Sequence, residues 1–344
     1  MKLPAYALLQ LADRERAPIE PQYGGAARWT MVAAGDGSTD QAKLIRNTLS
    51  TVLYRGQNQH FDPCWPSICR GFQRNTHRVV DLDPIDRARL LRGLALNRWF
   101  ANELAKHPMM RWAKSEGILV DAIALAQHYG IPTAYIDVSE SFEIAAFFAT
   151  CRFVQATASW EPMTKGEGAM YCLHFNAIDE RISPICYQPF PRPLQQWAWT
   201  IELRLGESFL QAPTLQEFRF DHDARVGEEM LRRFDGGSKL LPHDPTARLA
   251  SAICAASEIP SIYVEEVESW LAGDPNGLPA QDAKDLRATL QDELKVSLSN
   301  TSAISYTQDE LNIAERDWLK SSRELYIDVN FRAVRPLPKG NSEN

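Results

Sequence analysis

The fold of this chain is decided by one stretch near its middle, which reads Gln127-His128-Tyr129-Gly130-Ile131-Pro132-Thr133-Ala134-Tyr135-Ile136-Asp137-Val138-Ser139-Glu140-Ser141. Residues 118–129 before the turn predict a helix, and Gly130 followed by Pro132 is typical of a helix end. Residues 132–138 predict a strand, and Ser139 or Ser141 then caps a helix that runs to Phe153. This order of elements places His128, Tyr129 and Asp137 where all three can face one cleft.

Strands and helices are expected on both sides of this stretch in an uneven order, which predicts an α+β fold. The central sheet is expected to be mixed or antiparallel and flanked by helices, with a mostly helical C-terminal extension, and residues 1–28 offer one more strand to it. Further strands are expected at 29–34, 51–54, 169–175, 199–205, 215–220 and 324–334, with a loop at 184–193. Helices are expected from Thr39 or Asp40 to Leu49, from Asp83-Pro84 to Pro108, and at 227–234, 245–257, 261–271, 279–298 and 309–321.

The composition limits the possible cellular locations and the possible binding partners of the protein. The 344 residues include 37 Lys and Arg and 44 Asp and Glu, a formal net charge of −7. This argues against a broad electrostatic grip on nucleic acid but leaves room for a local basic groove. The apolar runs are far shorter than the roughly 20 residues of a membrane span, and the N-terminus has no secretory pattern. A cytoplasmic location without membrane contact is therefore expected. No metal site is expected, because Cys64 and Cys69 lack a second close pair or a neighbouring His.

The first candidate site is Tyr54-Arg55-Gly56-Gln57, at or near the end of its strand. The planar guanidinium of Arg55 can hold a phosphate or a carboxylate through two hydrogen bonds, and Gly56 lets a ligand approach the backbone. The alternative is a structural arginine beside a turn, which is the commoner meaning of an isolated Arg-Gly pair.

The second candidate site is the helix end and strand around His128 and Asp137. His128 changes charge near neutral pH and is suited to proton transfer or binding, while Asp137 is suited to orienting it. The alternative is that His128 and Tyr129 only fasten the helix end to the sheet. The helix after Ser141 is a scaffold, yet its N-terminal N–H groups offer an anion site beside residues 137–141.

The third candidate site is Arg192-Pro193-Leu194-Gln195-Gln196-Trp197-Ala198-Trp199, a loop that enters a strand. Its two amides beside two indoles offer hydrogen bonds and a stacking surface to a nucleotide base or a nicotinamide. The alternative is a buried aromatic corner whose polar atoms are satisfied by the local amides.

In this order the segments resemble the FRG domain, named for a Phe-Arg-Gly motif in which Tyr54 here replaces the Phe. The resemblance includes Trp65-Pro66-Ser67, Arg70, the stretch from His128 to Ser139, the helix from Ser141 to Ala149, and loosely Arg192 and Gln196. It implies an FRG domain at 29–260, preceded by an N-terminal segment at 1–28 and followed by an extension at 261–344. The chain departs from the family pattern at Ala134, Val138, Phe142 and Ala198.

A weaker resemblance is to ADP-ribosyltransferases of the Arg-Ser-Glu type, which implies a similar core and NAD as the substrate. It implies that Arg55 holds the pyrophosphate and that the strand ending at Ser139 shapes the nicotinamide pocket. Gln196 stands where these enzymes have a glutamate, so it is expected to hold a ribose, but an amide does not stabilise positive charge as a carboxylate does. The glutamates that would replace it if the fold brought them into the cleft are Glu140, Glu202, Glu266 and Glu268, of which the last two are expected on a helix.

The resemblances together imply a set of site residues and a function. The expected catalytic residues are Arg55, His128, Asp137 and Gln196. The expected ligand-binding residues are Arg55, Gly56, Gln57, Arg70, Tyr129, Thr133, Ser139, Ser141 and Arg192. The leading hypothesis is a bacterial NAD-dependent effector, a toxin or an anti-phage defence protein, that modifies a protein or nucleic acid and meets an antitoxin or defence partner through 261–344. The alternative is a non-catalytic module that recognises a nucleotide or nucleic acid in a defence or regulatory complex. A metal-dependent nuclease is disfavoured, because no paired carboxylates with ligand spacing occur.

Overall fold

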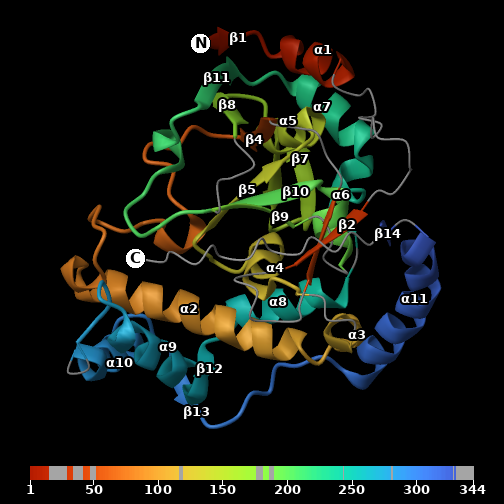
Figure 1. Cartoon of the computed structure of the whole chain (residues 1–344). Helices are drawn as coiled ribbons and strands as arrows, with labels where there is room; N and C mark the ends of the chain where they lie inside the picture. Colours follow the sequence, from red (N-terminus) through yellow and green to blue (C-terminus); the bar gives the residue numbers. More distant parts are fainter. Residues whose placement is uncertain are drawn as a thin grey trace, which may run out of the picture.

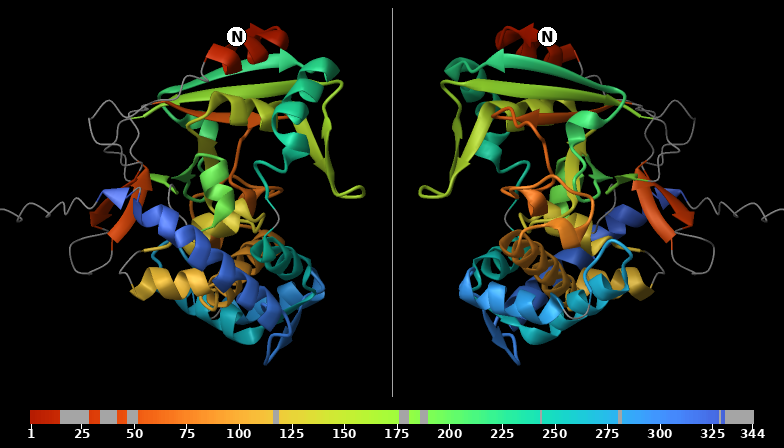
Figure 2. Two further views of the ribbon diagram at one scale, coloured as in Figure 1. Left: turned by 90° about the vertical axis from the view of Figure 1, so that its right-hand side faces the viewer. Right: turned by 90° about the vertical axis from the view of Figure 1, so that its left-hand side faces the viewer.

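The structure is a computed structural model that describes residues 1–14, 29–33, 42–46, 52–115, 119–175, 181–185, 190–242, 244–279, 282–327 and 329–330. A seven-stranded sheet forms the upper half of the molecule and a layer of helices forms the lower half (Figures 1 and 2). The protein is therefore α+β with a mixed central sheet, as the sequence predicts. Within the described residues, no helix combines the length and the apolar character that crossing a bilayer requires.

The central sheet has the strand order β1-β11-β8-β4-β5-β10-β9. β1 pairs with β11 in parallel, so the N-terminal segment does add a strand to the main sheet, and the remaining pairs are antiparallel. The strands are β1 (Lys2–Leu3), β4 (Val52–Gln57), β5 (Tyr135–Ser139), β8 (Glu167–His174), β9 (Ile182–Pro184), β10 (Ala198–Glu202) and β11 (Leu215–Asp221).

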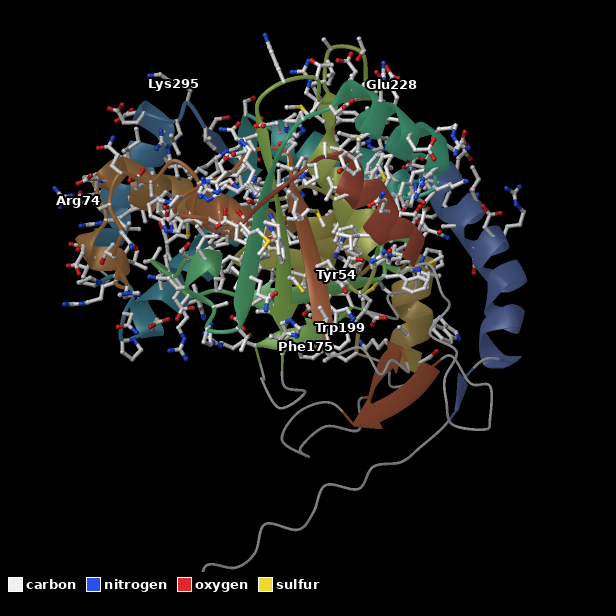
Figure 3. The ribbon with its side chains drawn as sticks, turned by 90° about the horizontal axis from the view of Figure 1, so that it is seen from above. Tyr54, Arg74, Phe175, Trp199, Glu228 and Lys295 are labelled. Atoms are coloured by element: carbon white, nitrogen blue, oxygen red, sulfur yellow. The ribbon has the colours of Figure 1, made fainter. Side chains whose placement is uncertain are left out.

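The middle of this sheet is split. β4 pairs with β8 along its whole length, but it meets β5 only at the pair Tyr54 and Ser139. Beyond that pair the two strands diverge, which leaves backbone groups of both strands without a ladder partner. Viewed from above (Figure 3), Tyr54 lies on β4 at the centre of the sheet. Phe175 and Trp199 lie beside each other with ring centroids 5.2 Å apart, so the end of β8 reaches β10 across the split.

One helix packs closely on the sheet beside the split. Ser141 caps α5 (Phe142–Thr150) by accepting a hydrogen bond from the N–H of Ile144 at 3.3 Å. Gly56 makes the close approach to α5 possible, because a Cβ at this position would lie 1.7 Å from the carbonyl oxygen of Ala145. Helices α1 (Tyr6–Arg14) and α7 (Ala224–Arg233) pack on the other side of α5 and complete this smaller core.

The larger core lies between the sheet and the long helix α2 (Pro84–Leu104). Two helices of the predicted C-terminal extension, α9 (Ser261–Gly273) and α10 (Asp282–Asp292), pack on α2 and share this core. The other helices of this half are α3 (Pro108–Ser115), α4 (Ala122–His128), α6 (Pro191–Gln195), α8 (Pro245–Ala255) and α11 (Gln308–Ile327). Short 3-10 turns lie at Ser67–Cys69, Val79–Asp81, Phe209–Gln211 and Asp235–Gly237.

Several predicted elements are wrong because strand pairing between distant residues overrides the local pattern. The helix predicted up to Leu49 is instead the strand β3 (Ala42–Arg46), which pairs with β2 (Trp29–Ala33) in a separate small sheet with β14 (Val329–Asn330). The helix predicted to reach Phe153 ends at Thr150, and the chain continues as β6 (Cys151–Val154), which forms a hairpin with β7 (Ser159–Pro162).

The bounds of four other elements also differ from the predictions. The predicted helix 84–108 ends at Leu104, and Pro108, which has no N–H to donate, begins α3. The predicted loop 184–193 contains the end of β9 and the start of α6, and its residues 186–189 lie outside the described part. The predicted helix 279–298 stops at Asp292, because β13 (Ser297–Ser299) pairs with β12 (Glu258–Pro260). Of the predicted strand 324–334, residues 324–327 belong to α11, β14 covers Val329–Asn330, and the remaining residues lie outside the described part.

Candidate functional site

The split between β4 and β5 opens a cavity of about 390 Å³. Its lining joins the end of β4, the end of α4, β5 and the turn before β10, which are distant in sequence. Its polar lining residues are Arg55, Gln57, Asn58, Arg70, Gln127, His128, Asp137, Ser139 and Gln196. Its aromatic lining residues are Tyr54, Phe61, Phe148, Phe153 and Trp160.

Two arginines give the cavity a positive wall. Arg55 donates from Nη1 to the carbonyl oxygen of Asp137 at 2.6 Å, so it bridges the strands where they diverge. The Nε atom of Arg55 is buried, and no described residue accepts a hydrogen bond from it. Arg70 lies at the exposed mouth, where partial desolvation and then the charge of Arg55 lower its pKa. Within the described ranges neither guanidinium forms a salt bridge, so an anionic ligand would relieve their mutual repulsion.

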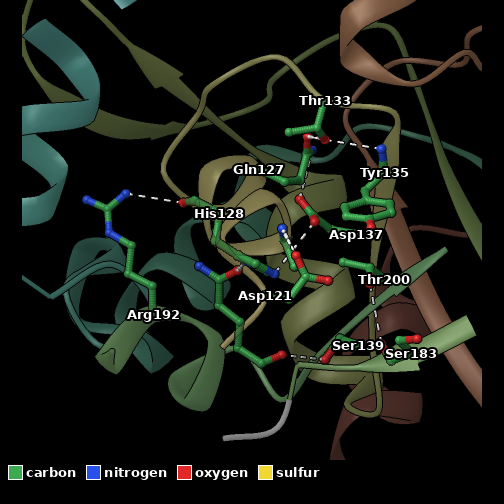
Figure 4. A network of polar contacts seen from close by, with 12 residues as sticks. Asp121, Gln127, His128, Thr133, Tyr135, Asp137, Ser139, Ser183, Arg192 and Thr200 are labelled. Carbon is green, nitrogen blue, oxygen red and sulfur yellow. Dashed lines mark hydrogen bonds and ion pairs between the residues drawn. The ribbon is translucent and has the colours of Figure 1, made fainter. Parts of the chain in front are cut away.

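Figure 4 shows His128 beside Asp137 and Gln127. The tautomer of His128 is defined, because the side chain that bonds its Nδ1 is itself held by a backbone carbonyl. The amide nitrogen of Gln196 donates to the carbonyl oxygen of Leu240 at 3.1 Å, which leaves Gln196 Oε1 to accept from His128 Nδ1 at 3.0 Å. Nδ1 therefore carries the hydrogen, and Nε2 faces Asp137 Oδ1 at 3.6 Å. Both of these facing atoms are buried without a hydrogen-bond partner among the described residues. The imidazole and the carboxylate therefore face each other closely inside the protein.

Asp137 is the member of the pair that faces the cavity. Its side chain is 33% exposed, whereas the side chain of His128 is 2% exposed. Its Oδ2 accepts from Gln127 Nε2 at 3.1 Å, and Gln127 Oε1 accepts from the hydroxyls of Ser67 at 3.0 Å and Thr133 at 2.6 Å. These bonds hold the carboxylate in one orientation. Asp137 can therefore meet a ligand directly, and His128 acts through it.

The structure brings eight of the predicted site residues to the cavity lining, namely Arg55, Gly56, Gln57, Arg70, His128, Asp137, Ser139 and Gln196. It places four others elsewhere. Thr133 binds Gln127 and the N–H of Tyr135, and Ser141 caps α5. Tyr129 donates its hydroxyl to Asp244, away from the cavity, and Arg192 lies over the Tyr129 ring at 4.7 Å. Burial, and then Asp244, raise the pKa of Tyr129, so the phenol stays neutral.

None of the four candidate glutamates lines the cavity as the structure describes it. Glu140 accepts from Trp199 Nε1 at 2.6 Å, so this indole belongs to a buried aromatic corner and offers no open stacking surface. Glu268 lies on α9 and accepts hydrogen bonds from Arg287 of α10. Asp137 is thus the one carboxylate among the described residues that line the cavity.

The sequence reasoning missed the aromatic wall of the cavity. Phe148 lies on the predicted helix, but the same prediction extended that helix over Phe153. The sequence therefore did not predict the β6–β7 hairpin that carries Phe153 and Trp160. Asn58 and Phe61 lie just after the Arg-Gly motif in the sequence, so they are the additional lining residues that this motif could have indicated. Among the described residues, no group of three or more His, Cys, Asp or Glu side chains is arranged to hold a metal ion.

The fold and the cavity define an α+β domain with a polar ligand site at a split in its sheet. Residues 50–157 match the family model of the FRG domain. The chain contains an FRG domain, as the sequence resemblance indicated. The matched residues hold Arg55, Arg70, His128 and Asp137, whereas Gln196 lies beyond them, and the wider bounds 29–260 remain a prediction. No curated protein and no solved structure matches the chain.

Proposed function

We propose that the cavity binds NAD and that this FRG-domain protein is an ADP-ribosyltransferase-like effector that modifies a macromolecule. The observation that carries the proposal is the meeting of Arg55, Arg70 and the His128–Asp137 pair in one cavity of about 390 Å³. That volume lies within the range of about 300–1,000 Å³ found for ligand pockets. The adjacency of the strands that bear Arg55 and Ser139 also agrees with the order of parts in the enzymes that the sequence resembles.

The arginines would bind the pyrophosphate. Arg55 uses one N–H group on the carbonyl of Asp137, which fixes its plane and leaves other donors for a phosphate oxygen. Arg70 stands at the mouth with its charge unpaired by the described carboxylates, and would contact the second phosphate. A guanidinium already held by one bond loses less conformational entropy on binding, so Arg55 is preorganised for this task.

Asp137 would stabilise the reacting centre. Cleavage of a glycosidic bond passes through a transition state with oxocarbenium-like positive charge, which a fixed carboxylate stabilises. Gln127 holds the Asp137 carboxylate in place, and the His128 imidazole lies 3.6 Å behind its other oxygen. Both polar ends of the Gln196 side chain are bonded, to His128 and Leu240. We therefore assign Gln196 to orienting His128, in place of the ribose contact expected from the sequence.

Calorimetric titration with NAD tests binding. We expect Arg55→Ala to weaken the affinity by about 10-fold to 100-fold, the range for losing a hydrogen bond to a charged group. Arg74→Ala is the matched control, because this exposed arginine pairs with Asp83 at 3.6 Å outside the cavity. Absence of any NAD affinity in the wild-type protein would remove the proposal.

Release of nicotinamide tests catalysis. Asp137→Asn keeps the size and the hydrogen-bonding capacity of the side chain but removes its charge, so the variant is expected to bind NAD and to release no nicotinamide. Expression of the wild type is expected to slow cell growth, and Arg55→Ala or His128→Ala to relieve this effect, if the target is essential as for a toxin or a defence effector.

The alternative function is a non-catalytic module that recognises a nucleotide or the end of a nucleic acid. It is favoured by one observation, which is that no glutamate lines the described cavity. In this case NAD or another nucleotide would bind in an Arg55-dependent way without nicotinamide release, and expression would be harmless. In either function, we assign residues 261–344 to contacts with a macromolecular partner, such as an antitoxin.

A further inference from the structure

The cavity has an aromatic wall that the proposed phosphate and ribose contacts do not use. Phe61 is 42% exposed and Phe153 is 47% exposed, and both line the cavity beside Phe148 and Trp160. Large apolar side chains this exposed are few among the described residues. Two of them at the mouth of one charged cavity indicate a surface that is covered when a ligand binds.

The wall is a firm platform. Trp160 contacts Phe147 of the core at 5.0 Å between ring centroids and Phe148 at 5.7 Å. Phe153 pairs with Trp160 across the β6–β7 hairpin at 5.6 Å and an interplanar angle of 63°. Gly237 packs against the Trp160 ring, since a Cβ there would lie 2.7 Å from Trp160 Cδ1. The exposed ring of Phe153 therefore rests on an indole that the core holds in place.

The platform also lies next to the arginine strand. β4 runs from Arg55, which is bonded to the carbonyl of Asp137, to Gln57, and the following Asn58 donates to the carbonyl oxygen of Cys151 at 3.2 Å. Cys151 is the first residue of β6. Asp137, Arg55 and the aromatic hairpin thus line one cavity, and the end of β4 is bonded directly to the start of the hairpin.

We propose that Phe153, backed by Trp160, is the stacking platform for the adenine base of the ligand. This inference rests on the proposed function, in which Asp137 takes the nicotinamide ribose and the arginines take the pyrophosphate. The base at the other end of the dinucleotide then meets the hairpin. Adenine is a flat ring that can stack on the exposed ring of Phe153, and the diphosphate attached to its ribose can bind the two arginines of the same cavity. The ligand class is therefore an adenine nucleotide that carries a diphosphate, and the nicotinamide mononucleotide half alone lacks the group that the platform binds.

Calorimetric titrations with NAD, ADP-ribose, ADP and nicotinamide mononucleotide test the platform. Phe153→Ala is expected to weaken NAD, ADP-ribose and ADP by one common factor of about 5-fold to 150-fold, the range for the loss of one base–aromatic stack. Nicotinamide mononucleotide is expected to bind the variant as it binds the wild type. Phe153→Tyr keeps the ring and is expected to retain the affinity, whereas Phe153→Leu keeps apolar area without the ring and is expected to lose it.

Trp270→Ala is the matched control, because Trp270 is 49% exposed and lies outside this cavity. NAD binding that depends on Arg55 but not on Phe153 would overturn the platform and leave the proposed function standing. Equal losses for nicotinamide mononucleotide and ADP would also overturn it. ADP binding that depends on Phe153, in a protein that does not bind NAD, would remove the proposed function and support the platform. A protein that binds none of the four compounds would refute both.

Discussion

Two buried tyrosines allow the loss of a hydroxyl group to be compared where the hydroxyl is hydrogen-bonded and where it is not. Tyr129 donates its hydroxyl to Asp244, a buried carboxylate whose other oxygen caps α8 by accepting from the N–H of Thr246 at 2.8 Å. Tyr171 is 1% exposed, and its hydroxyl has no hydrogen-bond partner in the part of the chain that the structure describes. Both residues lie in the larger core, so replacing either by Phe removes one oxygen atom and leaves the ring in place.

The two substitutions are expected to change stability in different directions. Tyr129→Phe removes a hydrogen bond to a charged group and leaves a buried carboxylate oxygen without its donor, which is expected to destabilise the protein by about 1.5–3 kcal/mol. Tyr171→Phe removes a hydroxyl that is desolvated without compensation, so it is expected to be neutral or to stabilise the protein by about 1 kcal/mol. Because Tyr129 follows His128 directly, Tyr129→Phe is also expected to make the position of the His128 imidazole less well defined.

Urea denaturation followed by tryptophan fluorescence and by circular dichroism measures both free energies of unfolding. Imidazole ¹⁵N chemical shifts report whether His128 keeps its hydrogen on Nδ1 in the Tyr129 variant. A Tyr171→Phe protein that loses as much stability as Tyr129→Phe would refute the assignment of the Tyr129–Asp244 bond as the cause. A Tyr129→Phe protein as stable as the wild type would do the same.

Two further predictions concern packing and pH. Gly56→Ala is expected to destabilise the protein by at least about 1–3 kcal/mol and to abolish ligand binding, because its Cβ would lie 1.7 Å from the carbonyl oxygen of Ala145 on the packed helix α5. Thermal unfolding measures this loss. Gly273→Ala is the control, because the space around Gly273 is open. Burial lowers the pKa of His107 to about 4 from its ordinary value of 6.5, so the unfolded chain binds the proton first as the pH falls. The contribution of the neutral His107 to the free energy of unfolding is complete above pH 6.5 and decreases towards pH 4. Between pH 7 and pH 5, the stability of the wild type is therefore expected to fall by about 2 kcal/mol more than that of His107→Phe. Equal losses for the two proteins in urea denaturation would contradict this.

Local signals in the sequence predicted the elements that carry the site. Asp83-Pro84 marks the start of α2, Gly130 adopts the positive φ of 86° that ends α4, and Ser141 caps α5. Each of these features depends on residues within one helical turn, so the sequence displays them directly. The resemblance to the FRG domain and to ADP-ribosyltransferases implied that Arg55, His128, Asp137 and Gln196 share one site, and all four line the cavity.

Other features depend on partners far along the chain and left no local trace. β3 and β6 form because they pair with β2 and β7, and their own residues do not distinguish these strands from helices. Tyr129 turns away from the cavity because Asp244, 115 residues later, accepts its hydroxyl. Gln196 is turned to His128 by the carbonyl of Leu240.

The sequence by itself determined which groups are present at the site and on which kinds of element they lie. It determined the FRG domain and the α+β class, and it gave the expectation that an arginine, a histidine and an aspartate share one site. Only the tertiary structure decided the cavity, because the cavity exists where β4 and β5 stop pairing after Tyr54 and Ser139. Strand register and divergence are set by packing over the whole sheet, and no short stretch of residues encodes them.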